Sequence, residues 1–337
     1  MQVWTSIDQV PRDFASVVTI GNFDGMHRGH RRVISACVDR ARKRGVAAVA
    51  CTFDPHPRQV HQPDSHMQLI SPLEDRLSAM DAAGLDHTLV IHYDRSFYSL
   101  TAREFVQLTL VEVLGAVEVV VGEDFRFGKD NAGTVETLRE LGREYGFDVV
   151  MVADIISPQG RRWSSSWVRE LLDEGDVAQA AYVNGARAAY VWGPQHRVRG
   201  VVQHGFKRGR KLGFPTANLS EGIDGVVPAD GVYAGWVVRS VPNTTAREFY
   251  PAAISVGTNP QFGGDKRTVE AHVLGRADLN LYGERIAVHF VERIRAMQAF
   301  DSVDALTAQM DDDLRQTALV LGIGVSGRVD PDAVTAN

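Results

Sequence analysis

The chain has 337 residues, of which 44% are hydrophobic, and carries a formal net charge of −6. This length predicts two domains with packed cores, and the acidic balance argues against a dedicated nucleic-acid-binding protein, which usually has a strongly basic face. Two cysteines, Cys37 and Cys51, are too few for a disulfide framework. Because neither a signal-peptide pattern nor an apolar run long enough to span a bilayer is found, we expect a cytoplasmic protein without membrane contact.

The first half alternates short β-branched runs with amphipathic segments. This alternation is typical of a parallel sheet covered by helices on both faces. We therefore expect residues 1–186 to form an α/β domain with a Rossmann-like sheet. The expected strands are Val17–Ile20, Val46–Phe53, Thr88–His92, Val117–Val121 and Val149–Val152, and the expected helices are Arg31–Arg44, Leu73–Ala83, Ala102–Leu114 and Val135–Tyr145.

The second half, from about Ala186, consists of strand-like runs separated by Gly and Pro. Short strands with such turn signals are typical of a small barrel or sandwich. We expect residues 187–337 to form a mainly β domain closed by a terminal helix from Ser302 to Leu321, in which Asp311–Asp313 is a solvated face. The expected strands are Ala189–Trp192, Val198–Gln203, Val232–Val238, Ala252–Val256, Val269–Leu274 and Ile286–Phe290.

Three loops that follow predicted strands of the first half are rich in Gly, His, Asp and aromatic residues. They are Gly21–His30, Asp54–Pro57 and Gly122–Gly128. Ligands of an open parallel sheet bind beyond the carboxyl ends of its strands. The three loops therefore predict one binding site at this edge.

The first loop is the most specific of the three. His27 and His30 are three residues apart at the start of a helix, so they share one face, and a helix N-terminus favours anions. Gly29 leaves room for a phosphate, and two imidazoles can donate hydrogen bonds to charge that develops on a phosphoryl group. The alternatives are two surface histidines or a zinc pair, although no third zinc ligand has a suitable spacing.

These loops resemble a known family. With Thr52–Pro57 and Gly122–Gly128, the run Gly21–His30 is similar to the N-terminal module of prokaryotic bifunctional FAD synthetases, in the nucleotidyltransferase superfamily with a His-x-Gly-His motif. A second hallmark of that superfamily, Ser-Ser-Thr-x-x-Arg, is matched by Ser164–Arg169, with Ser166 in place of the usual Thr. Because Ser166 keeps the hydroxyl, we expect the motif to function.

The resemblance implies direct transfer of AMP from ATP to FMN, without a covalent enzyme intermediate. Catalysis then rests on positioning and charge stabilisation, with His27 and His30 as catalytic residues. A simple helix cap is the alternative role for Ser164–Ser166. The resemblance assigns ATP or its phosphates to Gly21, Phe23, Asp24, Gly29, Asp124, Arg162, Ser165, Ser166 and Arg169, and the flavin to Phe53, Asp54, Pro55, His56 and Pro57.

A glycine-rich basic loop, Gly205–Gly213, stands out in the second half. Its glycines and four cations suit a polyphosphate, although it lacks the spacing of a Walker loop and a solvated basic turn is the alternative. If Thr216 and Asn218 lie on one strand, they point the same way. Their oxygens are suitable ligands for Mg²⁺, or the two side chains simply face water.

The run Pro215–Asn218 closely resembles the hallmark of riboflavin kinases, and Pro228–Ala234 and Ser255–Pro260 resemble further blocks of that family. A kinase that acts on an alcohol benefits from a carboxylate base. The resemblance assigns this role to Glu270, for which a solvent-facing strand position is the alternative. It assigns ATP to Gly205, Lys211 and Gly213, Mg²⁺ to Thr216 and Asn218, and the flavin to Arg295 and Phe300.

The resemblance covers both modules and predicts a bifunctional enzyme with riboflavin, FMN and ATP as substrates. Mg²⁺ accompanies ATP, and FMN and FAD are substrates or products rather than prosthetic groups. Alternatives are an adenylyltransferase whose barrel only binds flavin, a non-catalytic flavin or nucleotide sensor, and a nucleotidyltransferase for another phosphate ester. The sequence leaves open whether the chain forms a homo-oligomer, and it departs from the family pattern at Gln261, Gly275, Gln298 and Ala299.

Overall fold

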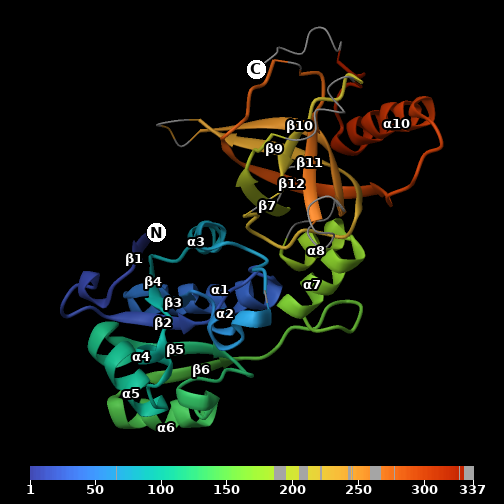
Figure 1. The fold of residues 1–337 in the computed structure, drawn as a ribbon. Helices are drawn as coiled ribbons and strands as arrows, with labels where there is room; N and C mark the ends of the chain where they lie inside the picture. Colours follow the sequence, from blue (N-terminus) through green and yellow to red (C-terminus); the bar gives the residue numbers. More distant parts are fainter. Residues whose placement is uncertain are drawn as a thin grey trace. The chain divides into compact units, whose positions relative to one another are not determined.

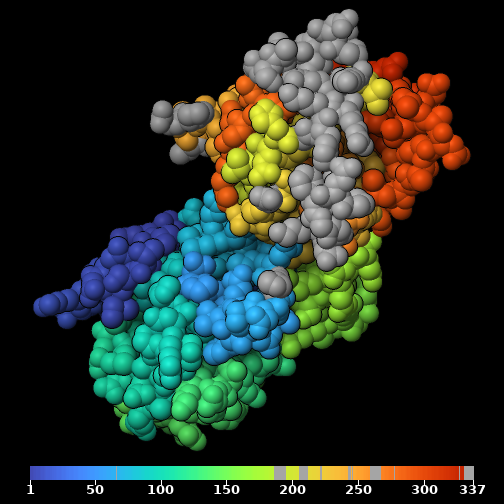
Figure 2. Space-filling view, viewed as in Figure 1, coloured from blue at the N-terminus to red at the C-terminus, as the bar shows by residue number. Residues whose placement is uncertain are grey.

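The computed structural model divides the chain into two compact units, Met1–Ser165 and Ser166–Asn337 (Figure 1). It describes residues 1–65, 67–185, 195–204, 212–220, 222–241, 244, 246–258, 267–276, 278–325 and 327–329. In the space-filling view the first unit runs from blue to green and the second from yellow-green to red (Figure 2). The domain boundary expected at residue 186 falls outside the described ranges and stays a prediction.

The first unit contains a parallel sheet, which confirms the predicted α/β fold. In the described part of this unit the sheet has six strands in the order β1-β4-β3-β2-β5-β6. The edge strand β1 was not predicted, because three residues are too few to show a period. The strands are β1 (Gln2–Trp4), β2 (Ser16–Ile20), β3 (Ala47–Asp54), β4 (His87–His92), β5 (Ala116–Gly122) and β6 (Asp148–Val152).

Helices cover both faces of this sheet (Figure 1). Successive strand residues point to opposite faces, so Val18 and Val119 join the core with Leu110, while Val17 and Val120 join the core with Ile34. The α-helices are α1 (Arg28–Arg44), α2 (Pro57–His61), α3 (Leu73–Ala82), α4 (Arg95–Tyr98), α5 (Ala102–Phe105) and α6 (Val135–Tyr145), with 3-10 turns at Ile7–Gln9, Pro63–Ser65 and Lys129–Asn131.

Two helix predictions needed correction. Helix α1 begins at Arg28 and not at Arg31, because the His27 side chain caps its N-terminus by accepting from the backbone N–H of His30. The predicted helix Ala102–Leu114 is α5 followed by a π-helix at Val106–Val113. A capping box of Thr101 and Glu104 starts α5, whereas hydrophobic periodicity does not distinguish π-helical from α-helical turns.

The second unit is an antiparallel barrel with flanking helices, which confirms the predicted fold class. Its described strands follow the order β7-β12-β9-β10-β11-β8. An isolated bridge between Gln203 and Asn218 brings the chain after β7 against β8, so the sheet returns on itself. The strands are β7 (His196–Val201), β8 (Ala217–Leu219), β9 (Gly231–Ser240), β10 (Arg247–Thr258), β11 (Arg267–Val273) and β12 (Arg285–Arg295).

Three helices are described beside this barrel. Helix α7 (Ser165–Glu174) is followed by α8 (Val177–Val183), and the backbone N–H of Ala229 donates to the carbonyl of Leu172 on α7. The predicted terminal helix is α10 (Val303–Leu321), capped by Ser302. The strand expected at Ala189–Trp192 lies outside the described residues.

Gly235 on β9 lies where two strands approach closely. A Cβ at this position would lie 2.0 Å from the His289 carbonyl oxygen and 2.5 Å from Ile254 Cδ1. We therefore expect Gly235→Ala to lower the free energy of unfolding of the second unit by about 1–3 kcal/mol or more, measured by urea unfolding with tryptophan fluorescence. The control is Gly200→Ala on β7, where the nearest atom lies at 3.4 Å. Equal loss in both variants would contradict the packing argument.

Candidate active sites

The three loops predicted to form a site follow β2, β3 and β5, which lie side by side in the sheet. The strand order reverses at β2 and β5, the place where open α/β sheets bind ligands. Two cavities lie there. The histidine cavity, of about 300 Å³, is lined by residues that include His27, His30 and Arg162. The aromatic cavity, of about 290 Å³, is lined by residues that include Phe53 and Phe125.

Most of the residues expected to bind phosphate meet in the histidine cavity. The structure brings together residues from the loops after β2 and β5 and from the segment before α7. Those on its wall are Gly21, Phe23, His27, Gly29, His30, Asp124, Arg162 and Ser165. Asp24 is not on this wall, and Ser166 and Arg169 lie on α7 in the second unit.

The rings of His27 and His30 stack, with their centroids 3.6 Å apart. His27 Nδ1 accepts from the His30 backbone N–H at 3.3 Å, so in the neutral ring Nε2 carries the proton. Burial, followed by the charge of Arg162, lowers the pKa of His27 to about 4. Burial also lowers the pKa of His30 well below its usual value, with further lowering by His27 and Arg162. Both rings are therefore neutral hydrogen-bond donors at pH 7.

Close packing explains the two glycines of this loop. A Cβ on Gly29 would lie 3.0 Å from the His27 ring, and one on Gly21 would lie 3.1 Å from the Phe23 ring. The buried Phe23 ring in turn contacts His30 edge to face at 5.4 Å. The glycines thus allow the aromatic and imidazole rings to pack. The phosphate access expected at Gly29 stays a prediction.

Arg162 is held between two carboxylates. Its Nη2 donates to Asp124 at 2.6 Å, and its Nε forms an ion pair with Asp154 at 2.7 Å. The planar guanidinium presents its N–H donors in a geometry that suits carboxylates and would equally suit a phosphate. Sequence analysis missed Asp154, although it follows β6 at the same edge as Asp54 and Asp124. Because ligands of an open parallel sheet bind beyond the carboxyl ends of its strands, the position of Asp154 after a predicted strand is a signal that could have identified it.

The aromatic cavity contains only part of the residues expected to bind flavin. Phe53 and Pro57 are on its wall, whereas Asp54, Pro55 and His56 are not. His56 is buried and caps α2 through Nδ1, which accepts from the Arg58 backbone N–H at 3.1 Å. The rings that sequence analysis missed follow β4 or lie on α4 and α5, and they are Tyr93, Phe97, Tyr98 and Phe105.

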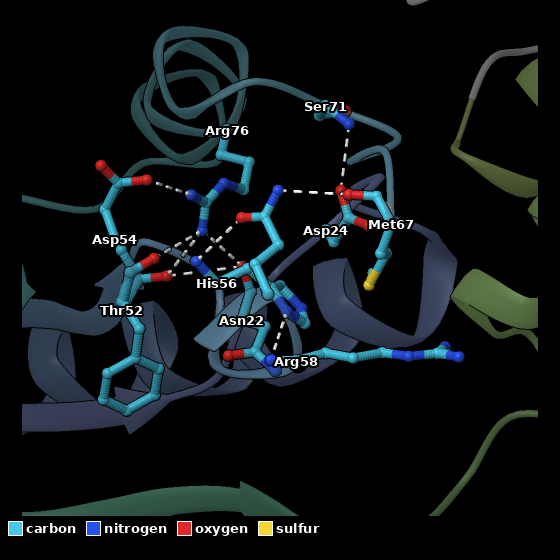
Figure 3. Close-up of polar contacts among 11 residues, drawn as sticks. Asn22, Asp24, Thr52, Asp54, His56, Arg58, Met67, Ser71 and Arg76 are labelled. Atoms are coloured by element: carbon cyan, nitrogen blue, oxygen red, sulfur yellow. Dashed lines mark hydrogen bonds and ion pairs between the residues drawn. The ribbon is translucent and has the colours of Figure 1, made fainter. Parts of the chain in front are cut away.

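Asp24 supports the loop and does not line a described cavity. Its carboxylate accepts from the backbone N–H of Ser71 at 3.0 Å (Figure 3) and from that of Ile70 at 3.3 Å. Its backbone carbonyl accepts from the Ser165 hydroxyl at 2.8 Å. Asp24 is therefore placed to hold the loop after β2 against the segment before α3. Its expected contact with ATP stays a prediction.

The second unit has a barrel cavity of about 240 Å³, with Thr216, Glu270, Arg295 and Phe300 on its wall. Glu270 lies on β11, opposite Asn218 of β8 and Ser255 of β10. Burial raises the pKa of the Glu270 carboxyl. Glu270 therefore faces a cavity and not bulk solvent, and its carboxylate is a stronger base than an exposed one.

Arg295 and Asp313 form an ion pair at this cavity. Arg295 donates from Nε and Nη2 to the two carboxylate oxygens at 2.8 and 2.7 Å, and its guanidinium lies 5.8 Å from the Phe300 ring centroid. The interpretation of Asp311–Asp313 as a solvated face is wrong for Asp313, which is 4% exposed. Successive residues of an α-helix are rotated by about 100°, so Asp313 lies on a different side of the helix from Asp311, the side that faces Arg295.

The residues expected to bind ATP and Mg²⁺ in the barrel are described in part. The Thr216 hydroxyl lies 3.4 Å from Asn218 Oδ1, and Asn218 Nδ2 donates to the Thr216 carbonyl at 3.1 Å. Gly213 has φ 84°, and a Cβ there would lie 2.5 Å from the Val329 carbonyl oxygen. Gly205 and Lys211 lie outside the described residues.

The departures from the kinase pattern leave this cavity in place. Gln298 lines it, and Gly275 takes a positive φ of 67° in the turn after β11, which glycine adopts most readily. Ala299 does not line the cavity, and Gln261 lies outside the described residues.

The first unit thus has two adjoining cavities and the second unit has one, with different side chains on their walls. This arrangement defines a two-domain, nucleotide-dependent transferase. The FAD synthetase family matches residues 10–167, and the riboflavin kinase family matches residues 192–321. No helix in the described part of the chain is long and apolar enough to cross a membrane.

Similar proteins carry both activities in their names. The chain is 34% identical over 308 residues to the bifunctional riboflavin kinase/FMN adenylyltransferase of Escherichia coli (strain K12), covering 91% of this chain and 93% of that protein. The Bacillus subtilis (strain 168) protein of the same name is 32% identical over 305 residues, with 89% and 91% covered. The chain belongs to the family of bifunctional riboflavin kinases/FMN adenylyltransferases, as predicted.

A solved structure has a similar fold over nearly the whole chain. It is a Streptococcus pneumoniae protein titled a macrolide-efflux protein, with 30% identity and a TM-score of 0.79, covering 94% of this chain and 97% of that one. This similarity shows that the two-unit architecture occurs in another chain of similar length.

The burial of His27 gives a prediction on pH. Its pKa is about 4 in the folded chain against the ordinary 6.5, so its contribution to stability is present above pH 6.5 and is lost as pH falls toward 4. We expect the His27 ring signals in NMR not to titrate between pH 8 and 5. The first unit should lose on the order of 3 kcal/mol of stability between pH 6.5 and 4, and His27→Asn, which keeps the cap, should reduce this loss. Titration of the ring near pH 6.5 would contradict the structure.

Proposed function

We propose that this chain makes FAD from riboflavin in two ATP-dependent steps, one in each unit. The barrel phosphorylates riboflavin to FMN, and the α/β unit adenylylates FMN to FAD with release of pyrophosphate. The observation that carries the proposal is that each unit has a cavity with the groups for its own step, in a chain that belongs to a bifunctional family. This argues against a sensor that has lost its phosphate-binding residues.

In the adenylylation step, a phosphate oxygen of FMN attacks the α-phosphorus of ATP. The bond from the α-phosphorus to the bridging oxygen breaks, and pyrophosphate leaves with the electron pair. Neutral His27 and His30 stabilise the charge on the phosphoryl oxygens by donating hydrogen bonds, and Arg162 adds a cation. The carboxylates of Asp124 and Asp154 hold Arg162 in position before ATP binds.

The two adjoining cavities support this division of substrates. The histidine cavity presents donors and a cation suited to phosphates, whereas the aromatic cavity presents the rings of Phe53, Phe97 and Phe125, which suit the planar flavin. Gly21 and Asp124 line both cavities, so the reacting phosphates of FMN and ATP meet at that boundary.

In the kinase step, Glu270 accepts the proton of the terminal hydroxyl of riboflavin while that oxygen attacks the γ-phosphorus of ATP and ADP leaves. A carboxylate whose pKa is raised by burial is a suitable base. The pair of Arg295 and Asp313 fixes the neighbouring wall, and Phe300 offers a ring to the flavin.

Mg²⁺ fits the barrel as the companion of ATP. The Thr216 hydroxyl and Asn218 Oδ1 are neutral oxygens 3.4 Å apart, and the contact of Asn218 Nδ2 with the Thr216 carbonyl keeps Oδ1 turned toward the hydroxyl. Two such ligands, with phosphate oxygens and water, match the coordination of Mg²⁺. When bound, the ion neutralises charge on the phosphates.

We further propose that residues 1–186 and 187–337 form the two functional modules.

A time course of products tests the function as a whole. With riboflavin, ATP and Mg²⁺, we expect FMN to appear first and FAD to follow, as resolved by chromatography. FMN alone would contradict the assignment of the first unit. FAD formed from added FMN, but no conversion of riboflavin, would contradict the assignment of the barrel.

Single substitutions test whether the two sites are separate. His30→Ala is expected to lower FAD formation from FMN by about 100-fold or more, because a donor to the phosphoryl group is lost, with riboflavin phosphorylation unchanged. Glu270→Ala is expected to lower riboflavin phosphorylation by about 100-fold or more through loss of the base, with FAD formation from FMN unchanged. Equal loss of both activities in both variants would overturn the two-site proposal.

A further inference from the structure

Arg76 on α3 is a completely buried arginine that the mechanism above does not use. Its side chain is 0% exposed, and arginine is almost never fully buried unless it is paired. It lines neither the histidine cavity nor the aromatic cavity. Any effect of Arg76 on the reaction must therefore be transmitted by the residues that it contacts.

The contacts of Arg76 join two loops (Figure 3). Its Nη1 donates to the carbonyl oxygen of Asn22 at 2.9 Å, to the carbonyl oxygen of Phe53 at 3.2 Å and to the Thr52 hydroxyl at 3.3 Å. Its Nη2 lies 3.4 Å from the Asp54 carboxylate. One guanidinium thus holds the loop after β2 and the end of β3 together.

The contacts of Arg76 begin where the backbone pairing of β2 with β3 ends. The parallel register of β2 and β3 ends at Ile20 and Cys51, with one further backbone bond from the Gly21 N–H to the Cys51 carbonyl. Asn22 and Phe53 lie just beyond this point. Where the strands diverge into loops, they no longer exchange backbone hydrogen bonds. Beyond this point the Arg76 side chain links the two segments through the carbonyl oxygens of Asn22 and Phe53.

Both of the segments joined by Arg76 form the wall of the aromatic cavity. Asn22 and Phe53 line that cavity, on the sides contributed by β2 and β3. The distance between these two sides determines the space for a planar ligand. Loss of the guanidinium would remove a donor from the carbonyl oxygens of Asn22 and Phe53, and the Asn22 carbonyl would retain the longer contact with the Thr52 hydroxyl at 3.4 Å. Polar groups that lose a donor favour movement of the loops toward other partners.

The loop after β2 depends on such support because its backbone is strained. Phe23 and Met26 have positive φ values of 52° and 45°, which non-glycine residues rarely adopt. Strained backbone persists only where the surrounding structure holds it. The segment that leads into Arg76 supplies a second support, since the N–H groups of Ile70 and Ser71 donate to Asp24.

Burial of the charge has a cost that the contacts only partly offset. Burial lowers the pKa of Arg76, whereas the carboxylates of Asp24 and Asp54 raise it. Its Nε has no hydrogen-bond partner among the described residues. Apolar side chains often stabilise a core as well as buried ions do, so stability alone does not account for a guanidinium here. The presence of a guanidinium is explained by the several acceptors that surround its two terminal nitrogens.

We propose that Arg76 is a positioning residue for FMN adenylylation, which fixes the gap between Asn22 and Phe53 and thereby the shape of the flavin side of the site. This inference rests on the proposed function of the first unit. Arg76 lines neither cavity, so we expect its loss to change the fit of FMN and not the chemistry at phosphorus.

The test compares Arg76→Met with wild type in the full chain, using FMN and ATP for one activity and riboflavin and ATP for the other. Methionine fills the volume of the stem and removes the donors. We expect the KM for FMN to rise about tenfold or more, the KM for ATP to change less than about threefold, and riboflavin phosphorylation in the second unit to stay unchanged.

Arg42→Met is the matched control. Arg42 on α1 forms a fork with Asp86 at 2.7 and 2.9 Å and donates to the Gly84 carbonyl, so its loss also removes an ion pair of the first unit. It contacts neither loop of the site. We expect Arg42→Met to leave the KM for FMN at the wild-type value.

Two milder variants carry the test if Arg76→Met unfolds the first unit. Arg76→Lys keeps the charge but has one nitrogen in place of the fork, and Thr52→Val removes one acceptor at nearly constant volume. We expect each to raise the KM for FMN about threefold or more.

An unchanged KM for FMN in these variants, or an equal change in Arg42→Met, would overturn the role of Arg76 while leaving the proposed function standing. Absence of FAD formation in the wild-type chain would overturn the proposed function and the role of Arg76 together.

Discussion

The parallel pairing of β3, β2 and β5 is the constraint on which the first site depends. Because the three strands run in the same direction and lie side by side, their carboxyl ends deliver three loops to one edge. Residues as far apart in the chain as Asn22 and Phe125 then line one cavity. The register between β2 and β3 ends at Ile20 and Cys51, so beyond this point the Arg76 side chain helps to join the loop after β2 to the end of β3.

Those side chains set the electrostatics of the site. His27 is buried, His30 is partly buried, and burial lowers the pKa of both, so both rings are neutral at pH 7. Among the described wall residues of the histidine cavity, Arg162 is the cation, and it is paired with Asp124 and Asp154. A site that binds ATP must not attract it so strongly that pyrophosphate cannot leave. For the adenylylation proposed above, two neutral donors and one guanidinium that is already paired with carboxylates would hold pyrophosphate less tightly than unpaired cations would.

In the barrel, the antiparallel register of the strands determines which side chains lie next to Glu270. Pairing of β11 with β8 sets Glu270 opposite Asn218, and pairing with β10 sets it opposite Ser255. The proposed base and the proposed metal ligand thus come from neighbouring strands of the sheet. Helix α10 completes the cavity with Asp313, whose pair with Arg295 ties the helix to the last strand.

Local sequence determined much of this protein. Hydrophobic periodicity predicted both folds and α6 to the residue, and motif chemistry pointed to His27, His30, Arg162 and Glu270, all of which the structure places on cavity walls. These features repeat over a few residues or sit beside a strand end, so the chain shows them without its fold. Only the tertiary structure decided which wall each side chain reaches. Asp24 turned toward Ile70 and Ser71, Asp313 turned inward, and Arg76 was absent from every motif. Their partners lie 18 to 54 positions away in the chain, and contacts over such separations arise from packing, which no local pattern encodes.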